Sequence, residues 1–244
     1  MRIQAVVFDW AGTVIDWGCH GPVAALHRIF EERDVALEPS ESRHGMGLLK
    51  LDQIREIMKL PRVRQAWRSA NGLREPEEVD VQELYRRFLT VQLDCVEAHS
   101  DVIAGVPELV EKLRSAGIRI GSTTGYPRVV LDVILPKAKR QGYWPDCIVT
   151  PDDTGGLGRP LPWMIFENLR RLNAYPPGRC VKVGDTPWDI EEGRNAGLIT
   201  VGVCDSSSEA ATSGAGKARE LLLASGACLV IGAAPALVET LEDL

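Results

Sequence analysis

Short apolar runs alternate with amphipathic segments along most of this chain, and this alternation limits the folds that it can adopt. The candidate strands are Ile3–Phe8, Ile118–Ser122, Cys147–Thr150, Val181–Val183 and Thr200–Val203. The segments between them repeat apolar residues at helical spacing, as in Val106–Ser115, Pro162–Leu172 and Pro187–Ala196. Strands and helices in this order predict an α/β fold with a doubly wound, Rossmann-like parallel sheet.

Residues 18–100 interrupt the alternation, since they contain no convincing strand. Their helical stretches are Pro22–Arg33, Leu48–Leu60, Val63–Ser69 and Val81–Glu97. We therefore predict a catalytic core of residues 1–17 and 101–244, and an inserted helical cap domain of residues 18–100. The expected hinges are Gly18 and residues 100–105. Residues 206–216 are rich in Ser, Ala and Gly, which predicts a mobile surface loop.

The composition excludes several classes of partner. A formal charge of −6 gives no general attraction for nucleic acid or for an anionic membrane surface. The most apolar late stretch, Leu229–Val238, is too short to span a bilayer. The six cysteines have no paired spacing, so neither a zinc site nor a disulfide framework is indicated. Reduced thiols are typical of the cytoplasm, where we expect the protein to work.

Polar residues follow four of the predicted strands, and ligands bind at the carboxyl ends of parallel strands. Asp9 ends the first strand, within Phe8-Asp9-Trp10-Ala11-Gly12-Thr13. A carboxylate at this position can attack phosphorus and form an acyl phosphate. Taken alone, the same aspartate can equally be only the cap of a turn.

Three further strand ends favour phosphoryl transfer. Ser122-Thr123-Thr124-Gly125 offers hydroxyl and N–H groups for phosphate oxygens, and Arg159 offers a fixed cation. Asp185 and Asp189 place two carboxylates four residues apart, of which one can bind magnesium and the other can orient a bound water. Each feature has an ordinary structural explanation, but four of them in this order are hard to credit to chance.

These motifs resemble those of the haloacid dehalogenase-like hydrolase superfamily, and the helical insertion resembles its type 1 cap. The resemblance extends to about Val203 and implies Mg²⁺ held by Asp9, the Ala11 carbonyl and Asp185, with Asp189 in support. Phosphatases of this superfamily usually carry a general acid two positions after the nucleophile. Ala11 cannot donate a proton, so an alkoxide leaving group would lose roughly 10²–10⁴-fold in rate.

Lys50 suggests a leaving group that needs no such acid. It begins an apolar cap helix behind Gly45 and Gly47. A desolvated amine can condense with a carbonyl to form an imine, which is an electron sink. Cleavage of a phosphonate with a carbonyl one carbon away would then leave an enamine and no alkoxide. An ordinary solvated helix lysine is nevertheless the more frequent explanation of one such residue.

Several local sequences are similar to the phosphonoacetaldehyde hydrolase family, including Met46-Gly47-Leu48-Leu49-Lys50, Gly121-Ser122-Thr123-Thr124-Gly125-Tyr126 and Lys182-Val183-Gly184-Asp185-Thr186. This resemblance implies cleavage of phosphonoacetaldehyde to acetaldehyde and phosphate, through an aspartyl-phosphate and a lysine imine, in a homodimer formed through the caps. The predicted catalytic residues are Asp9, Lys50, Thr124 and Arg159. The predicted substrate-binding residues are Ala11, Cys19, Met46, Gly47, Gln53, Gly125 and Tyr126.

One position departs from this family. A histidine usually stands three residues after the imine lysine, and this chain has Gln53, which cannot act as a base near neutral pH. His44 is a nearby candidate to replace it. Three alternatives stay open: a hydrolase of a related carbonyl phosphonate, a phosphate monoester phosphatase, which Ala11 argues against, and a non-catalytic binder, which an intact Asp9 argues against.

Overall fold

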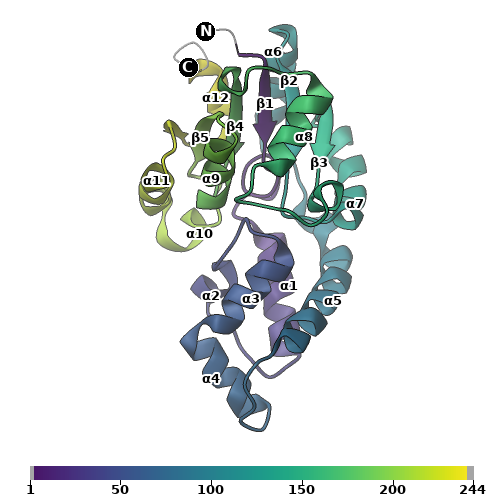
Figure 1. The fold of residues 1–244 in the computed structure, drawn as a ribbon, viewed down its shortest axis with the longest axis vertical. Helices are drawn as coiled ribbons and strands as arrows, with labels where there is room; N and C mark the ends of the chain where they lie inside the picture. Colours follow the sequence, from purple (N-terminus) through teal and green to yellow (C-terminus); the bar gives the residue numbers. More distant parts are fainter. Residues whose placement is uncertain (1–2, 241–244) are drawn as a thin grey trace.

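The computed structural model describes residues 3–240, which form a six-stranded parallel sheet with helices on both faces and a helical lobe at one end (Figure 1). The sheet order is β3-β2-β1-β4-β5-β6. The strands are β1 (Ala5–Phe8), β2 (Arg119–Thr123), β3 (Cys147–Val149), β4 (Cys180–Gly184), β5 (Ile199–Val203) and β6 (Leu229–Ile231). The predicted α/β class with a parallel, doubly wound sheet is confirmed.

The strand order reverses beside β1, which places the polar strand ends together. Phe8 lies opposite Ser122 of β2 and Val183 of β4. The residues that follow these three positions therefore emerge at the same level, on the edge of the sheet where ligands bind in this fold.

Helices bury both faces of the sheet, which explains why the strands are continuous apolar runs. On one face, Val6 and Phe8 pack with α6 (Val106–Ser115), α7 (Arg128–Arg140) and α12 (Leu237–Thr240). On the other face, Ala5 and Val7 pack with α8 (Trp163–Leu172). This second face continues over β5 and β6, with α9 (Pro187–Asn195) and α11 (Ala215–Ala224).

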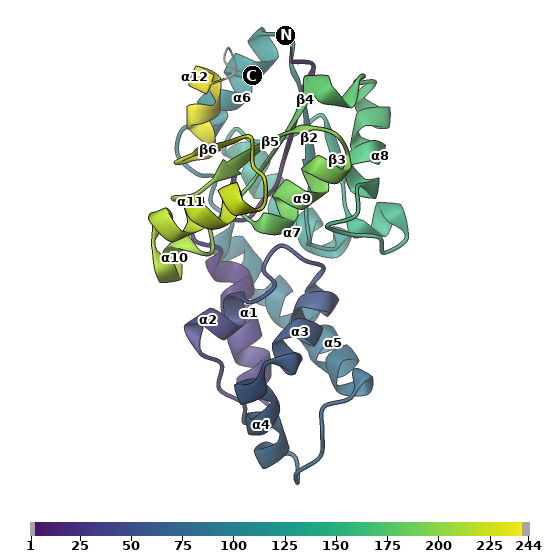
Figure 2. The same ribbon diagram turned by 60° about the vertical axis from the view of Figure 1, so that its left-hand side comes forward.

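The helical lobe has its own apolar core and lies beyond the carboxyl end of β1 (Figures 1 and 2). Its helices are α1 (His20–Glu31), α2 (Pro39–Arg43), α3 (Lys50–Lys59), α4 (Pro61–Ala70) and α5 (Glu78–Cys95). Leu26 and Phe30 of α1, Ile57 of α3 and Phe88 of α5 are completely buried in that core. The domain limits of 18 and 100 stay a prediction.

The two chain crossings between lobe and sheet run beside each other. Asp16 N donates to Asp101 O at 3.1 Å, and Ile103 N donates to Val14 O at 2.9 Å. The Asp16 carboxylate also accepts hydrogen bonds from the first amides of α1. A 3₁₀ turn, η1 (Val96–His99), ends the lobe before the second crossing. The other short elements are η2 (Pro151–Thr154), η3 (Pro177–Arg179), α10 (Ala210–Ser213) and η4 (Ala234–Ala236).

Some elements differ from the sequence-based expectation. Strand β6 was not predicted, and neither was α7, whose pattern contains Pro136. The helices α2, α10, α11 and α12 were also missed. The expected mobile surface loop at 206–216 is wrong for its first part, because Ser206, Ser207 and Ser208 are buried against the site. Within residues 3–240, every helix is too short or too polar to cross a membrane.

Candidate active site

Asp9 directly follows β1, and its backbone N–H donates to Val183 O at 2.9 Å. The next residues turn sharply, since the amides of Thr13, Val14 and Ile15 all donate to Trp10 O. Gly12 has φ +82° inside this turn, and a Cβ there would lie 2.5 Å from Asp185 Oδ2. Only glycine therefore lets the loop after Asp9 approach that carboxylate so closely.

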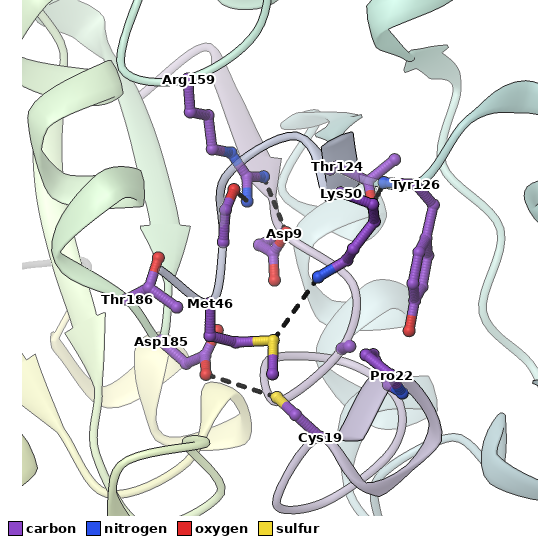
Figure 3. Close-up of a pocket in the computed structure, with 13 residues that line it drawn as sticks. Asp9, Cys19, Pro22, Met46, Lys50, Thr124, Tyr126, Arg159, Asp185 and Thr186 are labelled. Carbon is purple, nitrogen blue, oxygen red and sulfur yellow. Dashed lines mark hydrogen bonds and ion pairs between the residues drawn. The ribbon is translucent and has the colours of Figure 1, made fainter. Parts of the chain in front are cut away.

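Arg159 is the fixed cation that the sequence predicted, and it is buried. Its Nη2 lies 2.7 Å from Asp9 Oδ1 and 3.1 Å from Asp189 Oδ1, and its Nε lies 3.1 Å from Glu192 Oε2 (Figure 3 shows the first of these contacts). Burial alone would lower the pKa of Arg159, but the charges of Asp189, Asp9 and Glu192 outweigh it and raise the pKa. The guanidinium is therefore charged at every working pH.

A second buried cation, Lys182, supports the first. Its Nζ donates to Thr123 Oγ1 at 2.7 Å and lies 2.9 Å from Asp189 Oδ1 and 3.3 Å from Glu192 Oε2. Sequence analysis assigned no role to Lys182 or Glu192. Glu192 follows Asp189 by almost one helical turn of α9, so it points to the same side of that helix, and this spacing was the available signal.

The carboxylates of Asp9, Asp185 and Asp189 form a candidate metal centre, with one ligand atom of each within 4.8 Å of the others. Burial, followed by the charges of Asp9 and Asp189, raises the pKa of Asp185 well above its usual range. Asp185 Oδ1 is buried without a hydrogen-bond partner. Hard carboxylate oxygens suit a divalent cation such as Mg²⁺, and a cation here would offset the repulsion.

The three carboxylates are not equivalent. Asp189 Oδ2 accepts hydrogen bonds from Thr186 Oγ1 at 2.6 Å and from Thr186 N at 3.2 Å, while its Oδ1 faces Arg159 and Lys182. These two cations lower the pKa of Asp189 against the opposing effect of burial. Asp185 is therefore the carboxylate best placed to serve a metal, and Asp189 is the more fully neutralised one.

Lys50 begins α3 and reaches the site from the helical lobe, and it is 5% exposed, unlike a solvated helix lysine. Its Nζ donates to Gln53 Oε1 at 2.7 Å and lies 3.5 Å from Met46 Sδ (Figure 3 shows the Met46 contact). Burial, partly opposed by the charge of Asp9, lowers the pKa of Lys50 to about 8. A sizeable fraction of the amine is therefore neutral near physiological pH.

Gln53 is buried, and its orientation is fixed by its own hydrogen bonds. Its Nε2 donates to the carbonyl oxygens of His44 at 3.2 Å and of Ser42 at 3.4 Å, so Oε1 is the atom presented to Lys50. The His44 side chain is exposed. This geometry does not support the expectation that the imidazole of His44 takes the place of the family histidine.

A cavity of about 30 Å³ separates the Lys50 amine from Asp9 (Figure 3). All the predicted site residues line it except Gln53 and Asp189. Gln53 contacts the lining residue Lys50, and Asp189 contacts the lining residue Arg159. Its lining is Asp9, Ala11, Cys19, Pro22, Met46, Gly47, Lys50, Thr124, Gly125, Tyr126, Arg159, Asp185 and Thr186. Pro22 and Thr186 were missed, since neither carries a group that marks it in the sequence.

The remaining polar residues of the cavity are held in neutral forms. Thr124 Oγ1 accepts a hydrogen bond from Tyr126 N at 3.0 Å. Burial, followed by the charge of Asp185, raises the pKa of Cys19 well above its usual range, and its thiol donates to Asp185 Oδ2 at 3.6 Å. Burial also raises the pKa of Tyr126. The buried lysine amine is therefore the one nucleophile of the lining, apart from Asp9, that is available near neutral pH.

Comparisons with known proteins agree on one family. Residues 3–197 match the haloacid dehalogenase-like hydrolases. Over 209 residues the chain is 49% identical to a phosphonoacetaldehyde hydrolase of Bacillus cytotoxicus, covering 86% of this chain and 78% of that protein. A phosphonoacetaldehyde hydrolase of Bacillus cereus is 46% identical over 209 residues, which again cover 86% of this chain and 78% of that protein.

A solved structure, of a phosphonoacetaldehyde hydrolase-like protein from Oleispira antarctica, superposes with a TM-score of 0.96. It is 33% identical in sequence, and the superposition covers 100% of this chain and 92% of that one. A hydrolase from Pseudomonas syringae superposes with a TM-score of 0.76 at 18% identity, over 99% of both chains, which shows a shared fold alone.

Proposed function

Because this chain belongs to the phosphonoacetaldehyde hydrolases of the haloacid dehalogenase-like family, we propose that it hydrolyses the C–P bond of phosphonoacetaldehyde. The products are acetaldehyde and phosphate. The observation that carries the proposal is the cavity in which a buried amine, Lys50, faces a buried carboxylate, Asp9. A simple phosphatase or a binder has no need of that amine.

The first half of the reaction uses Lys50. Its neutral amine attacks the aldehyde carbon, and loss of water gives an iminium with the nitrogen of Lys50. Gln53 Oε1 accepts a hydrogen bond from this nitrogen in the structure, and it therefore fixes the direction from which the amine approaches. The lowered pKa supplies the neutral amine that the attack requires.

The second half uses Asp9. Its carboxylate attacks phosphorus, the C–P bond breaks, and the bond's electron pair moves into the iminium to give an enamine. Protonation of the enamine carbon and hydrolysis release acetaldehyde and regenerate Lys50. Water then hydrolyses the aspartyl-phosphate to phosphate and Asp9. No alkoxide forms at any step, so the absence of an acid at Ala11 costs nothing here, whereas a monoester phosphatase would need one.

Side chains, backbone groups and a metal ion hold the phosphonate during these steps. Arg159 stabilises charge on the transferring group, and Thr124 and the backbone around Gly125 offer further hydrogen-bond donors. Mg²⁺ is the divalent cation that we propose for the site, held by Asp9, the Ala11 carbonyl and Asp185 with Asp189 in support; when bound, it would neutralise charge on phosphonate oxygens. Cys19, Met46, Gly47 and Tyr126 enclose the two-carbon chain.

We also propose that the protein works in the cytoplasm as a homodimer formed through the helical lobes. All six cysteines are free, which fits a reducing compartment. The family resemblance supports the dimer. Light scattering on the purified protein tests it, and a monomer at micromolar concentration would contradict it.

The test measures acetaldehyde and phosphate released from phosphonoacetaldehyde in the presence of Mg²⁺. We expect equal amounts of both products, and no release by Lys50→Arg, which keeps the charge but cannot form the imine. Borohydride added during turnover should trap an adduct on Lys50.

Two outcomes would contradict the assignment. Trapping without release would point to a longer or branched carbonyl phosphonate as the substrate. Release of phosphate from simple esters by both the parent and Lys50→Arg would make the protein a phosphatase instead.

A further inference from the structure

The buried serines that follow β5 join parts of the site that lie far apart in the sequence. Ser206 Oγ donates to the carbonyl oxygen of Gly12, in the nucleophile loop, at 2.6 Å. The carbonyl of Ser206 accepts from Gly18 N, at the start of the lobe, at 2.9 Å. Ser206 therefore links the loop after Asp9 by hydrogen bonds to Gly18, where the chain first crosses from the core to the lobe.

Ser208 extends these contacts in two directions. Its backbone N–H donates to Asp185 Oδ2 at 3.1 Å, and its Oγ lies 2.8 Å from Nη1 of Arg43. The same Nη1 donates to Gly18 O at 2.7 Å. Since Arg43 is the last residue of α2, an unbroken series of contacts leads from the helical lobe to a carboxylate of the candidate metal centre.

These contacts lie beside a second cavity of about 260 Å³, between the lobe and the core. Arg43 and Ser208 line this larger cavity, and Met46, Asp185 and Thr186 line both it and the reactive cavity. The bond between Arg43 and Ser208 thus crosses from lobe to core next to the reactive site. Any separation of the two parts at this point has to break it.

We propose that Arg43 and Ser208 are positioning residues that couple closure of the helical lobe to the geometry of Asp185. In the closed form, Arg43 anchors Ser208, whose N–H holds Asp185 Oδ2 and leaves Oδ1 as the unpartnered oxygen. Opening of the lobe releases the anchor, so Asp185 binds a metal weakly until the lobe closes. This inference rests on the proposed function, which gives the reason why the metal centre should respond to closure of the lobe.

The experiment measures the rise in Tm of the full chain as Mg²⁺ is added without substrate. Ser208→Ala removes Oγ and keeps the backbone N–H, and Arg43→Met removes the guanidinium. We expect each to raise the Mg²⁺ concentration for a half-maximal shift by about 10-fold, as for other residues that orient metal ligands. The double variant should be no weaker than Arg43→Met alone.

Arg33→Met is the matched control, since Arg33 pairs with Glu83 at the exposed surface of the same lobe. A purely structural role would lower Tm equally with and without Mg²⁺ and leave the half-maximal concentration unchanged. That result, or effects of the two substitutions that multiply, would overturn the proposal. Because no turnover is measured, the outcome is independent of whether phosphonoacetaldehyde is the substrate.

Discussion

Lys50 and Gln53 form a pair in which an amide, rather than a titrating group, holds the reactive amine. The hydrogen bond from Nζ to Gln53 Oε1 stabilises the ammonium form more than the amine. It therefore limits how far burial can lower the pKa of Lys50, which stands at about 8. A lysine with this pKa predicts that kcat/KM rises with pH up to about 8 and then levels off.

Gln53→Leu tests this pair. Loss of the acceptor lowers the pKa of Lys50 further, so the rising limb of the kcat/KM profile should move to lower pH. The amine also loses its orientation, and we expect kcat at the optimum to fall by up to about 10²-fold. Gln82→Leu, which removes an exposed amide bonded to Glu78, is the control. A profile that coincides with the parent's would show that Gln53 does not act on Lys50.

At the scale of elements, two loops meet where the lobe closes on the sheet. Residues 45–49, between α2 and α3, lie against the loop that follows β2. A Cβ on Gly125 would stand 2.6 Å from Leu48 O, and one on Gly47 would stand 2.4 Å from Thr186 Oγ1. Glycine at 125 lets the backbones of the two loops approach each other, and glycine at 47 lets its loop pack against the side chain of Thr186. Both contacts bring the α3 N-terminus and Lys50 down to Asp9.

Gly125→Ala should therefore block full closure while the sheet stays intact. Gly125 does not have a positive φ, so the added methyl group acts only by crowding the backbone of Gly47 and Leu48, above all Leu48 O. We expect kcat/KM to fall by about 10²-fold with little change in Tm. Gly216→Ala is the control, since nothing lies within 4 Å of a Cβ there. Equal activity of the two variants would mean that this contact is not required for catalysis.

At the scale of the whole molecule, the site lies between two parts that have separate apolar cores. Beneath it, the carboxylates of Asp9, Asp185, Asp189 and Glu192 share the buried space with two cations, Arg159 and Lys182. The carboxylates outnumber these cations, and a divalent metal would balance the difference. Without a metal, burial of the charged Asp185 carboxylate and its repulsion by Asp9 and Asp189 oppose folding.

Asp185→Asn should thus have opposite effects with and without metal. In EDTA the substitution removes a repelled charge, and we expect Tm to rise by about 2–4 °C for each kcal/mol gained. In Mg²⁺ the variant should lose both the metal-dependent rise in Tm and its activity. Thermal unfolding of parent and variant under both conditions measures this. A lower Tm of the variant in EDTA would show that the carboxylate is already compensated.

The sequence determined the layout of the core. Apolar runs buried on both faces can form only a covered parallel sheet, and Asp9, Thr124 and Asp185 had to meet at its edge because they follow neighbouring strands. Four lobe helices, α1, α3, α4 and α5, were also predictable, with ends shifted by a few residues, because their apolar stripes are strong. The short α2 has no such stripe and was missed. Short β6 and the Pro136-containing α7 were not, since their patterns are weak or interrupted.

Tertiary structure decided what depends on contacts between distant segments. Burial of Lys50 and its lowered pKa arise only when the 45–49 loop seats on the core, and no local pattern distinguishes that lysine from a solvated one. Lys182 and Glu192 belong to the site only because both contact Thr123 and each other, and Thr123 is far from them in the sequence. Ser206–Ser208 looked like a surface loop because serines are common there, yet they are buried against Asp185, the loop after Asp9 and Arg43.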